Sequence, residues 1–269
     1  MIQDISPSRL DNSWQNMRPQ ADSFVMCFSD GRLLAAIGDG ALRFPRYRGE
    51  ADAVYLFSVD SERFFLADAD GIPDGFQYYT ARELRDRCTG KYLYAAFTAF
   101  HLHQWYADNR YCGVCRGVMQ HDTAERALVC ADCGHRVYPR INPAVIVGVI
   151  SKGRLLITRY RRGFAHNALV AGFTEIGETL EECVAREVME ETGLRVKNIR
   201  YYKSQPWGMA QDILAGFFCE ADGDDTIRMD ESELKSACWC RPEEIELQPN
   251  QHSLTNEMMR LFRDTNGIL

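Results

Sequence analysis

Residues 172–194 read Gly172-Phe-Thr-Glu-Ile-Gly-Glu-Thr-Leu-Glu-Glu-Cys-Val-Ala-Arg-Glu-Val-Met-Glu-Glu-Thr-Gly-Leu194 and combine a helix start, a helix end and dense acidic charge. Thr179 followed three residues later by Glu182 forms a capping box, which predicts a helix that begins at Leu180. Gly193 is placed to end that helix. The predicted helix has about thirteen residues and is roughly 20 Å long.

The acidic side chains of this helix do not all lie opposite its apolar face. Residues 175–191 contain seven glutamates and one basic residue. With Leu180 at zero and a turn of about 100° per residue, Glu187 lies near 340° and Glu191 near 20°, with Glu190 at about 280°. Glu187 and Glu191 therefore continue the apolar stripe of the helix, and Glu190 flanks it.

Carboxylates at the margin of a buried face cost free energy unless a positive group meets them. One arginine cannot neutralise this group, whereas a hard divalent cation can, and Mg²⁺ combines a few carboxylate oxygens with water and phosphate oxygens. The pattern thus favours a helix that holds Mg²⁺ or Mn²⁺ beside a phosphate substrate. The alternative is a solvated acidic helix face, which the position of the glutamates on the apolar stripe disfavours.

Two Cys-x-x-Cys pairs, Cys112/Cys115 and Cys130/Cys133, stand fourteen residues apart, with Gly134 directly after the second pair. Two such turns aim four thiolates at one ion, which is typical of a tetrahedral zinc site with no open position for water. The alternatives are two redox disulfides or four free thiols, but a redox pair normally begins a helix in a βαβ context, which is absent here. The spacing predicts a structural zinc ion.

Composition limits the class of protein. The chain has 269 residues and a formal net charge of −7, which disfavours a general nucleic-acid binder, although a local basic patch is compatible with it. It contains no apolar run of the roughly 18 residues that span a bilayer, and its first residues do not form a signal peptide, so we expect a cytosolic protein. Six further cysteines stand mostly among apolar residues and are expected to be buried.

The remaining sequence predicts three domains. Short apolar runs at 24–28, 33–37, 53–59 and 64–67, separated by turn signals, predict a β-rich N-terminal domain over residues 1–108, which ends in a helical segment capped by Thr80. The paired cysteines occupy residues 109–139. Residues 140–269 show strand patterns at 144–150, 155–158, 213–219 and 237–240 and a last helix near 255–263, which fits an α/β or α+β sheet with helices packed on it.

Residues 172–194 resemble the Nudix box, G-x5-E-x7-R-E-U-x-E-E-x-G-U with U aliphatic, at all nine defined positions. The resemblance implies a Nudix hydrolase, an α/β/α sandwich enzyme that cleaves a nucleoside diphosphate linked to another group. It implies that Glu187, Glu190 and Glu191 bind Mg²⁺ or Mn²⁺, while Arg186 and Glu178 pair to hold the loop between Gly172 and the helix that Gly193 ends.

A zinc ribbon directly before such a domain is similar to the NADH pyrophosphatase (NAD-capped RNA hydrolase) family. Members carry S-Q-P-W-P-F-P-x-S after the box, where this chain has Ser204-Gln-Pro-Trp-Gly-Met-Ala-Gln-Asp212, so only the first four positions match. Trp207 could stack on a purine or nicotinamide ring, or only pack in the core, and Gln205 could hydrogen-bond a base or amide edge. The expected substrate-binding residues of this loop are Gln205, Pro206, Trp207, Gly208, Met209, Ala210, Gln211 and Asp212.

The same resemblance implies further site residues. The carbonyl of Ala171 and the carboxylate of Glu233 resemble metal ligands, Glu233 being chosen over Glu231 by its distance from Trp239. Tyr138 resembles a substrate contact, and so does Thr255, which stands where members usually have Ala in S-I-A.

These features predict metal-assisted hydrolysis of the pyrophosphate bond of NADH or NAD⁺ to AMP and nicotinamide mononucleotide, and removal of NAD caps from RNA is a related possibility. Glu191 is favoured as general base, with Glu190 as the alternative. The rival predictions are a Nudix pyrophosphatase for ADP-ribose or dinucleoside polyphosphates and, in another class, a zinc-ribbon RNA-binding regulator. The resemblance also implies a homodimer.

Overall fold

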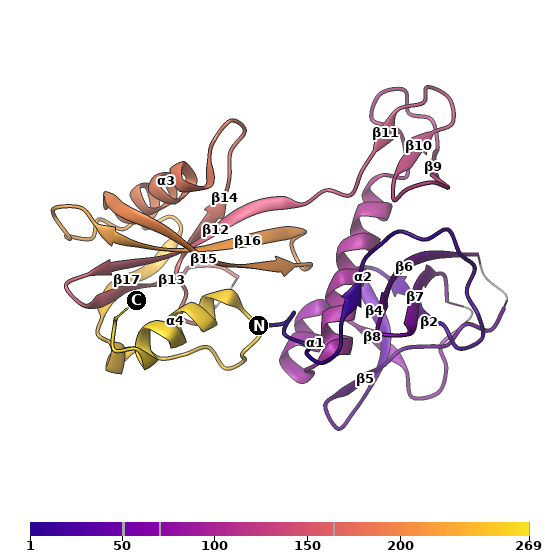
Figure 1. Ribbon diagram of the computed structural model, residues 1–269, viewed down its shortest axis with the longest axis horizontal. Coiled ribbons are helices and arrows are strands. Elements are labelled where there is room, and N and C mark those ends of the chain that lie inside the picture. Colours follow the sequence, from indigo (N-terminus) through magenta and orange to yellow (C-terminus); the bar gives the residue numbers. More distant parts are fainter. Residues whose placement is uncertain (50–51, 70, 164, 269) are drawn as a thin grey trace. The chain divides into compact units, whose positions relative to one another are not determined.

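The computed structural model describes residues 1–49, 52–69, 71–163 and 165–268 (Figure 1). These residues form two compact units. The C-terminal unit contains Met1, Asn142–Trp207 and Asp212–Leu269, and the N-terminal unit contains Ile2–Ile141 and Gly208–Gln211. In the described part of the chain, no helix is long and apolar enough to cross a membrane.

A six-stranded mixed sheet forms the centre of the C-terminal unit. Its order is β15-β16-β12-β13-β17, with β14 paired to β12, and only the β12–β16 pair is parallel. The strands are β12 (Asn142–Ser151), β13 (Arg154–Tyr160), β14 (Val170–Phe173), β15 (Val196–Trp207), β16 (Asp212–Ala221) and β17 (Leu234–Cys240), and the helical elements are α3 (Leu180–Thr192), the short 3₁₀ turn η1 (Pro242–Glu244) and α4 (Leu254–Asp264).

Alternate residues of β12 supply the two sides of the core, because successive side chains of a strand point to opposite faces. Val145 and Val147 belong to the apolar cluster that contains Val184 and Val188 of α3. Ile146 belongs to a second cluster, which contains Met258, Met259 and Phe262 of α4. The helices therefore cover opposite faces of the sheet, as Figure 1 shows, and the predicted α/β/α sandwich is confirmed.

The strands predicted at 144–150, 155–158, 213–219 and 237–240 and the helix near 255–263 are present, each within a few residues of its expected bounds. The sequence did not predict β14 or β15. β15 lies at one edge of the sheet and exposes most of its side chains, so it lacks the apolar pattern by which a strand is recognised.

The N-terminal unit is β-rich, as predicted. Its elements are β1 (Leu10–Asp11), β2 (Phe24–Met26), β3 (Phe28–Ser29), β4 (Arg32–Gly38), β5 (Ala41–Arg43), β6 (Ala53–Val59), β7 (Glu62–Ala67), β8 (Gln77–Tyr79), α1 (Ala81–Arg87), α2 (Lys91–Asp108), β9 (Met119–His121), β10 (Leu128–Cys130) and β11 (Arg136–Val137). Thr80 caps α1 as expected, with Glu83 completing the box. The helical segment is nevertheless not continuous, because Cys88 is extended and Gly90 has φ 81°, so α2 starts anew at Lys91.

The six cysteines outside the pairs are not all buried, which corrects one expectation. Cys27, Cys88, Cys183 and Cys219 are buried, Cys240 is partly exposed and Cys238 is exposed. The last two lie two residues apart on β17, an edge strand, with their sulfurs 3.6 Å apart. An edge strand has no neighbour on one side, so the surrounding apolar sequence does not ensure burial.

Candidate active site and zinc centre

Helix α3 has the bounds that its caps predict. The Thr179 side chain accepts a hydrogen bond from the Glu182 amide at 3.2 Å, and the Glu182 carboxylate accepts one from the Thr179 amide at 2.8 Å. Gly193 ends the helix in the left-handed conformation, with φ 69°. The predicted start and end of the helix are therefore confirmed. Together they fix the side of the helix on which each glutamate lies.

Arg186 is the positive centre of this region. Its guanidinium binds both carboxylate oxygens of Glu178, at 2.7 and 2.8 Å, and also donates to Glu187 at 2.7 Å and to Glu190 at 3.0 Å. The hydrogen bonds from Arg186 lower the pKa of Glu178 to about 2. Since Arg186 also donates to the Phe173 carbonyl at 2.9 Å, the pair ties the loop before α3 to the helix.

Glu187 lies against the backbone of Gly172. A Cβ at Gly172 would stand 1.9 Å from the carboxyl carbon of Glu187, so no other residue type fits this position without moving the carboxylate. Burial raises the pKa of Glu187, and Arg186 opposes that shift while the charges of Glu190 and Glu233 add to it. Close packing of Gly172 against the Glu187 carboxylate thus explains why the Nudix box has glycine at this position.

Glu191 is the most deeply buried acid of the group, with only 3% of its surface exposed. Its oxygens lie 3.1 and 3.3 Å from the hydroxyl of Tyr160, which donates to it. Burial raises the pKa of Glu191 to about 8, and the charges of Glu187 and Glu233 contribute, while hydrogen bonds from Tyr160 and the Ala171 amide oppose the shift. Burial and the neighbouring Glu191 raise the pKa of Tyr160 far above its ordinary value, so that hydroxyl keeps its proton.

Glu233 lies directly before β17, where its carbonyl accepts a hydrogen bond from the Arg161 amide at 2.9 Å. Its charge raises the pKa of both Glu187 and Glu191. The choice of Glu233 as the distal acid of the group stays a prediction.

The acids fit a hard cation in their chemistry. Glu191 is buried without a cationic hydrogen-bond partner among the described residues, and several carboxylates face it. In the described ranges, no set of three acids brings its oxygens within 4.8 Å, as the cysteines do. The fit to Mg²⁺ or Mn²⁺ thus rests on the chemistry of the carboxylates, which are oxygen ligands of the kind that hard cations prefer.

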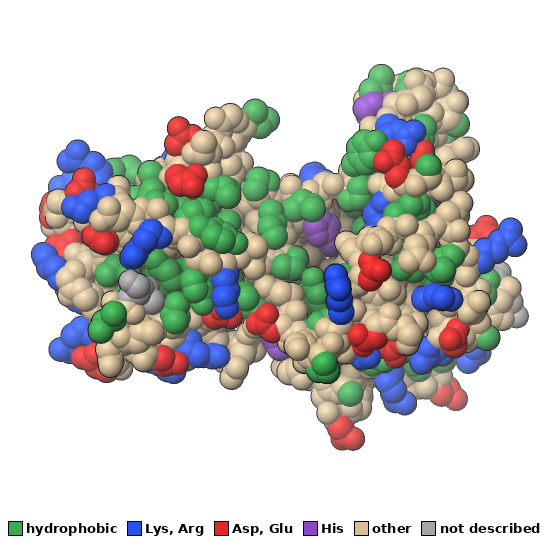
Figure 2. Space-filling view, viewed as in Figure 1, with side chains coloured by type: hydrophobic (Ala, Val, Ile, Leu, Met, Phe, Trp, Pro, Cys, Tyr) green, Lys and Arg blue, Asp and Glu red, His purple; other side chains and the backbone are tan. Residues whose placement is uncertain are grey.

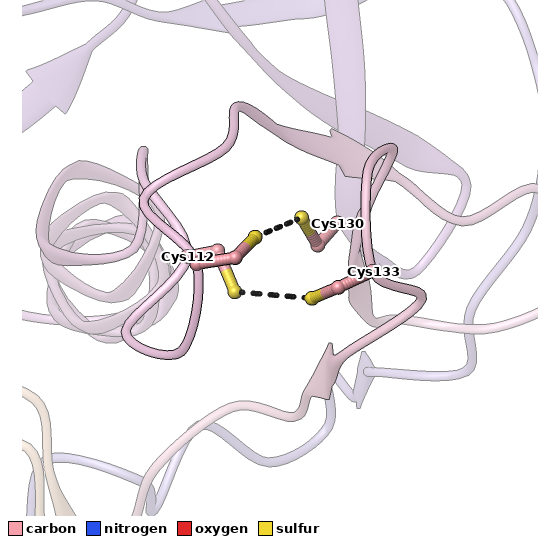
Figure 3. Close-up of side chains that lie close together, drawn as sticks. Cys112, Cys130 and Cys133 are labelled. Atoms are coloured by element: carbon pink, nitrogen blue, oxygen red, sulfur yellow. Dashed lines mark hydrogen bonds between the residues drawn. The ribbon is translucent and has the colours of Figure 1, made fainter.

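The four paired cysteines converge on one point of the N-terminal unit. Their sulfurs all lie within 4.8 Å of one another, and the Cys112–Cys133 and Cys115–Cys130 pairs are 3.7 and 3.4 Å apart (Figure 3). Tetrahedral zinc with bonds of about 2.3 Å separates its sulfurs by roughly 3.8 Å, so the set has the size of a zinc site. The amides of Cys115 and Val114 lower the pKa of Cys112 to about 6, whereas hydrogen bonds with Cys130 and Cys133 raise the pKa of Cys115 to about 12.

Comparison with known proteins agrees with both centres. Residues 140–262 match the NUDIX domain, and residues 107–138 match the NADH pyrophosphatase zinc ribbon domain. The chain therefore contains a NUDIX domain and a zinc ribbon domain of the NADH pyrophosphatase type. The NUDIX hydrolase of Nitrosomonas europaea, at 20% identity, superposes with a TM-score of 0.51 over 58% of this chain and 91% of that one, which shows the shared fold.

Two curated relatives of this chain are named NAD-capped RNA hydrolase NudC. The protein of Shigella flexneri is 41% identical and that of Escherichia coli (strain K12 / DH10B) is 40% identical, each over 167 residues. Each alignment covers 61% of this chain and 63% of the relative, so the match spans slightly less than two thirds of the relatives' length.

The first expected substrate residue of the loop after the Nudix box is Gln205. This side chain is fully buried, donates to the His252 carbonyl at 2.7 Å and accepts from the Leu254 amide at 2.7 Å. Both ends of the amide therefore hold the start of α4, and the contact of Gln205 with a base or amide edge stays a prediction. A buried amide with both groups satisfied has little to offer a ligand.

The other expected substrate residues of the loop lie around a turn. Pro206 and Trp207, both half-buried, end β15, and Gly208, Met209, Ala210 and Gln211 form the turn to β16. Asp212 begins β16 with 5% exposure, and burial raises its pKa to about 6. Its Oδ1 is buried with no hydrogen-bond partner among the described residues, which leaves an acceptor that a donor could satisfy.

Two expected contacts come from outside this loop. Thr255 lies half-buried in the first turn of α4. Tyr138, in the N-terminal unit, is 53% exposed and its hydroxyl donates to Glu125 at 3.0 Å.

Sequence reasoning missed Tyr160, because nothing in the pattern of β13 distinguishes a tyrosine that binds an acid from one that packs in the core.

Proposed function

We propose that this protein hydrolyses the pyrophosphate bond of a dinucleotide of the NAD type in a reaction that depends on Mg²⁺ or Mn²⁺. The observation that carries the proposal is the buried Glu191, with the charges of Glu187 and Glu233 acting on it, in a chain whose residues 172–194 match every defined position of the Nudix box. The zinc ribbon of the NADH pyrophosphatase type and the similarity to proteins named NAD-capped RNA hydrolase support the choice of dinucleotide.

Glu187, Glu190, Glu191 and Glu233, with the carbonyl of Ala171, would hold the divalent cations, which supply Lewis-acid polarisation of phosphate oxygens. Glu191 is the favoured general base, with Glu190 as the alternative. Glu191 is buried and Tyr160 holds its carboxylate at a fixed position, as a general base requires. Glu190, by contrast, is exposed and paired with Arg186.

The overall reaction adds one water across the P–O–P linkage. The water oxygen forms a bond to one phosphorus, the bridging oxygen leaves with the other phosphate, and two monophosphates result. From NADH the products would be AMP and reduced nicotinamide mononucleotide. An NAD cap on RNA contains the same linkage, and we include it as a substrate because the chain is similar to proteins named NAD-capped RNA hydrolase.

The test is a product analysis across NADH, NAD⁺, ADP-ribose, diadenosine polyphosphates and NAD-capped RNA with Mg²⁺ or Mn²⁺. We expect NADH to yield AMP, and we expect Glu191→Gln to lower kcat by roughly 10²- to 10⁴-fold. Glu181→Gln is the matched control, because Glu181 is an exposed glutamate in the first turn of the same helix. Efficient cleavage of ADP-ribose with NADH intact would reject the substrate, and full activity of Glu191→Gln would reject the site.

A zinc-ribbon regulator that binds RNA without turnover is the candidate of another class. On the face drawn in Figure 2, the described acidic and basic side chains are interspersed over both units and do not form one basic field. Nucleic-acid binders usually present such a field, so this face does not support the regulator. Tight RNA binding without metal-dependent products in the panel would support it.

We also propose a homodimer, as the family resemblance implies, and a cytosolic location, where a reducing environment keeps the ribbon cysteines available to zinc. Light scattering during size-exclusion chromatography measures the mass in solution, and cell fractionation tests the location. A monomeric mass of 30.7 kDa at micromolar concentration would contradict the dimer.

A further inference from the structure

Tyr160 connects three parts of the acid cluster through one hydroxyl. Its oxygen lies 3.1 and 3.3 Å from the two oxygens of Glu191 on α3, 3.2 Å from the amide nitrogen of Ala171 on β14, and 3.4 Å from the Leu169 carbonyl. Ala171 precedes the Nudix box, and its carbonyl is one of the proposed cation ligands. The hydroxyl thus contacts the backbone amide of the residue whose carbonyl is one proposed ligand, and the carboxylate of another.

A hydroxyl has one proton to donate, so its neighbours compete for it. Bonds to a carboxylate are stronger than bonds to a neutral carbonyl, and Glu191 is closer than Leu169, so the proton points to Glu191. The hydroxyl oxygen then accepts from the Ala171 amide. This arrangement orients the carboxylate and the β14 backbone together.

The strand geometry aims the ring at this point. β13 and β17 pair with a register shift between Arg159, which opposes Ser236, and Tyr160, which opposes Leu234. One residue of β17, Lys235, is therefore left without a partner, as in a β-bulge. Bulges increase the local twist of a strand and redirect its side chains, and they are frequent beside active sites.

We propose that Tyr160 is a positioning residue for the cation site, which holds Glu191 and Ala171 in the geometry that binds the divalent ion and receives a proton. The inference rests on the proposed function. Partners that hydrogen-bond to metal ligands typically affect metal affinity or activity by about 10- to 100-fold. Tyr160 acts through Glu191 and the Ala171 peptide and does not itself touch the substrate.

The test is Tyr160→Phe, which removes the hydroxyl and keeps the ring. We expect Mn²⁺ affinity without substrate, measured from the EPR signal of free Mn²⁺, to fall by about 10- to 100-fold. We expect kcat to fall by a similar factor at saturating Mn²⁺ while KM changes little, because the substrate contacts stay in place. In a Glu191→Gln background, Tyr160→Phe should add less than its effect in the wild type, since its effect passes through Glu191.

Tyr202→Phe is the matched control. Tyr202 lies in the same unit and its hydroxyl donates to Glu257 at 2.9 Å, away from the box. Both variants lose one tyrosine–glutamate hydrogen bond, so a purely structural role predicts similar falls in melting temperature and unchanged Mn²⁺ binding for both. Equal Mn²⁺ affinity and kcat in the two variants would overturn the proposal. The Mn²⁺ measurement needs no substrate, so it decides about Tyr160 even if no dinucleotide proves to be cleaved.

Discussion

At the scale of single residues, the site depends on Glu191, a buried acid whose charged form is stable only with suitable neighbours. Helical periodicity placed Glu191 on the apolar stripe, and its 3% exposure agrees with that. An isolated buried carboxylate is costly, and the hydrogen-bond partners of Glu191 are a tyrosine hydroxyl and one backbone amide, neither of which carries positive charge. A bound cation is therefore expected to stabilise the C-terminal unit as well as to serve catalysis.

This argument gives a pH-dependent prediction for Glu191→Gln without Mg²⁺ or Mn²⁺. The folded pKa of Glu191 is about 8, above the ordinary value of 4.5, so ionisation destabilises the fold as pH rises from 4.5 to 8. Glutamine carries no charge, so the variant should be more stable than the wild type at pH 8, by on the order of a few kcal/mol, and the difference should vanish near pH 4. Urea unfolding at several pH values measures it.

Glu181→Gln serves again as the control and should show no such pH-dependent gain, because Glu181 is exposed. Adding Mg²⁺ should stabilise the wild type more than Glu191→Gln, since binding to the folded state alone stabilises by mass action. A variant that is less stable than the wild type at pH 8 without divalent ions would contradict the assigned burial penalty.

At the scale of elements, the sequence was informative where a local signal and tertiary packing agree. The ends of α3 were predicted to the residue, because a capping box and a left-handed glycine act within a few residues of chain. β15 was missed because it is an exposed edge strand, and the break before α2 was missed although Gly90, with φ 81°, is a local signal for it. The orientation of Gln205 and Tyr160 depends on partners 47 and 31 residues away, which no local pattern contains.

The helix end allows a matched test with two glycines. Gly193→Ala must adopt φ 69°, and its Cβ would also stand 2.9 Å from the Cβ of Arg228. Gly153→Ala must adopt φ 72°, but no atom lies within 4 Å of the new Cβ. Both variants should lose about 1–2 kcal/mol for the left-handed backbone, and Gly193→Ala should lose more because of the contact. Thermal unfolding measures the loss of stability in both variants. Equal losses would show that Arg228 can move away from the new Cβ at no cost in free energy.

At the scale of the whole molecule, the acid group and the four paired cysteines belong to different compact units. We propose a catalytic role for the first and a structural role for the second. The acid group lies in the C-terminal unit, and the four cysteines lie in the N-terminal unit, where Cys112 and Cys130 pack with the buried Trp105 and with Met119 and Leu128. The ribbon hairpin buries few other apolar side chains, so the cross-link by zinc should supply much of its stability.

Removal of one zinc ligand should therefore unfold the ribbon and leave the acid group intact. Cys133→Ser changes an exposed side chain, so its effect arises from the metal and not from a cavity. We expect zinc, measured by inductively coupled plasma mass spectrometry, to fall from about one ion per chain to well below it, because the tetrahedral set loses a thiolate. Hydrogen exchange should rise over β9, β10 and β11, while Mn²⁺ affinity in the C-terminal unit should stay within about twofold, since additivity holds for independent sites.

The control is Cys238→Ser, which changes an exposed cysteine outside the ribbon, and this variant should keep about one zinc ion per chain. Retention of one zinc by Cys133→Ser with unchanged exchange would show that the four thiolates do not form the site.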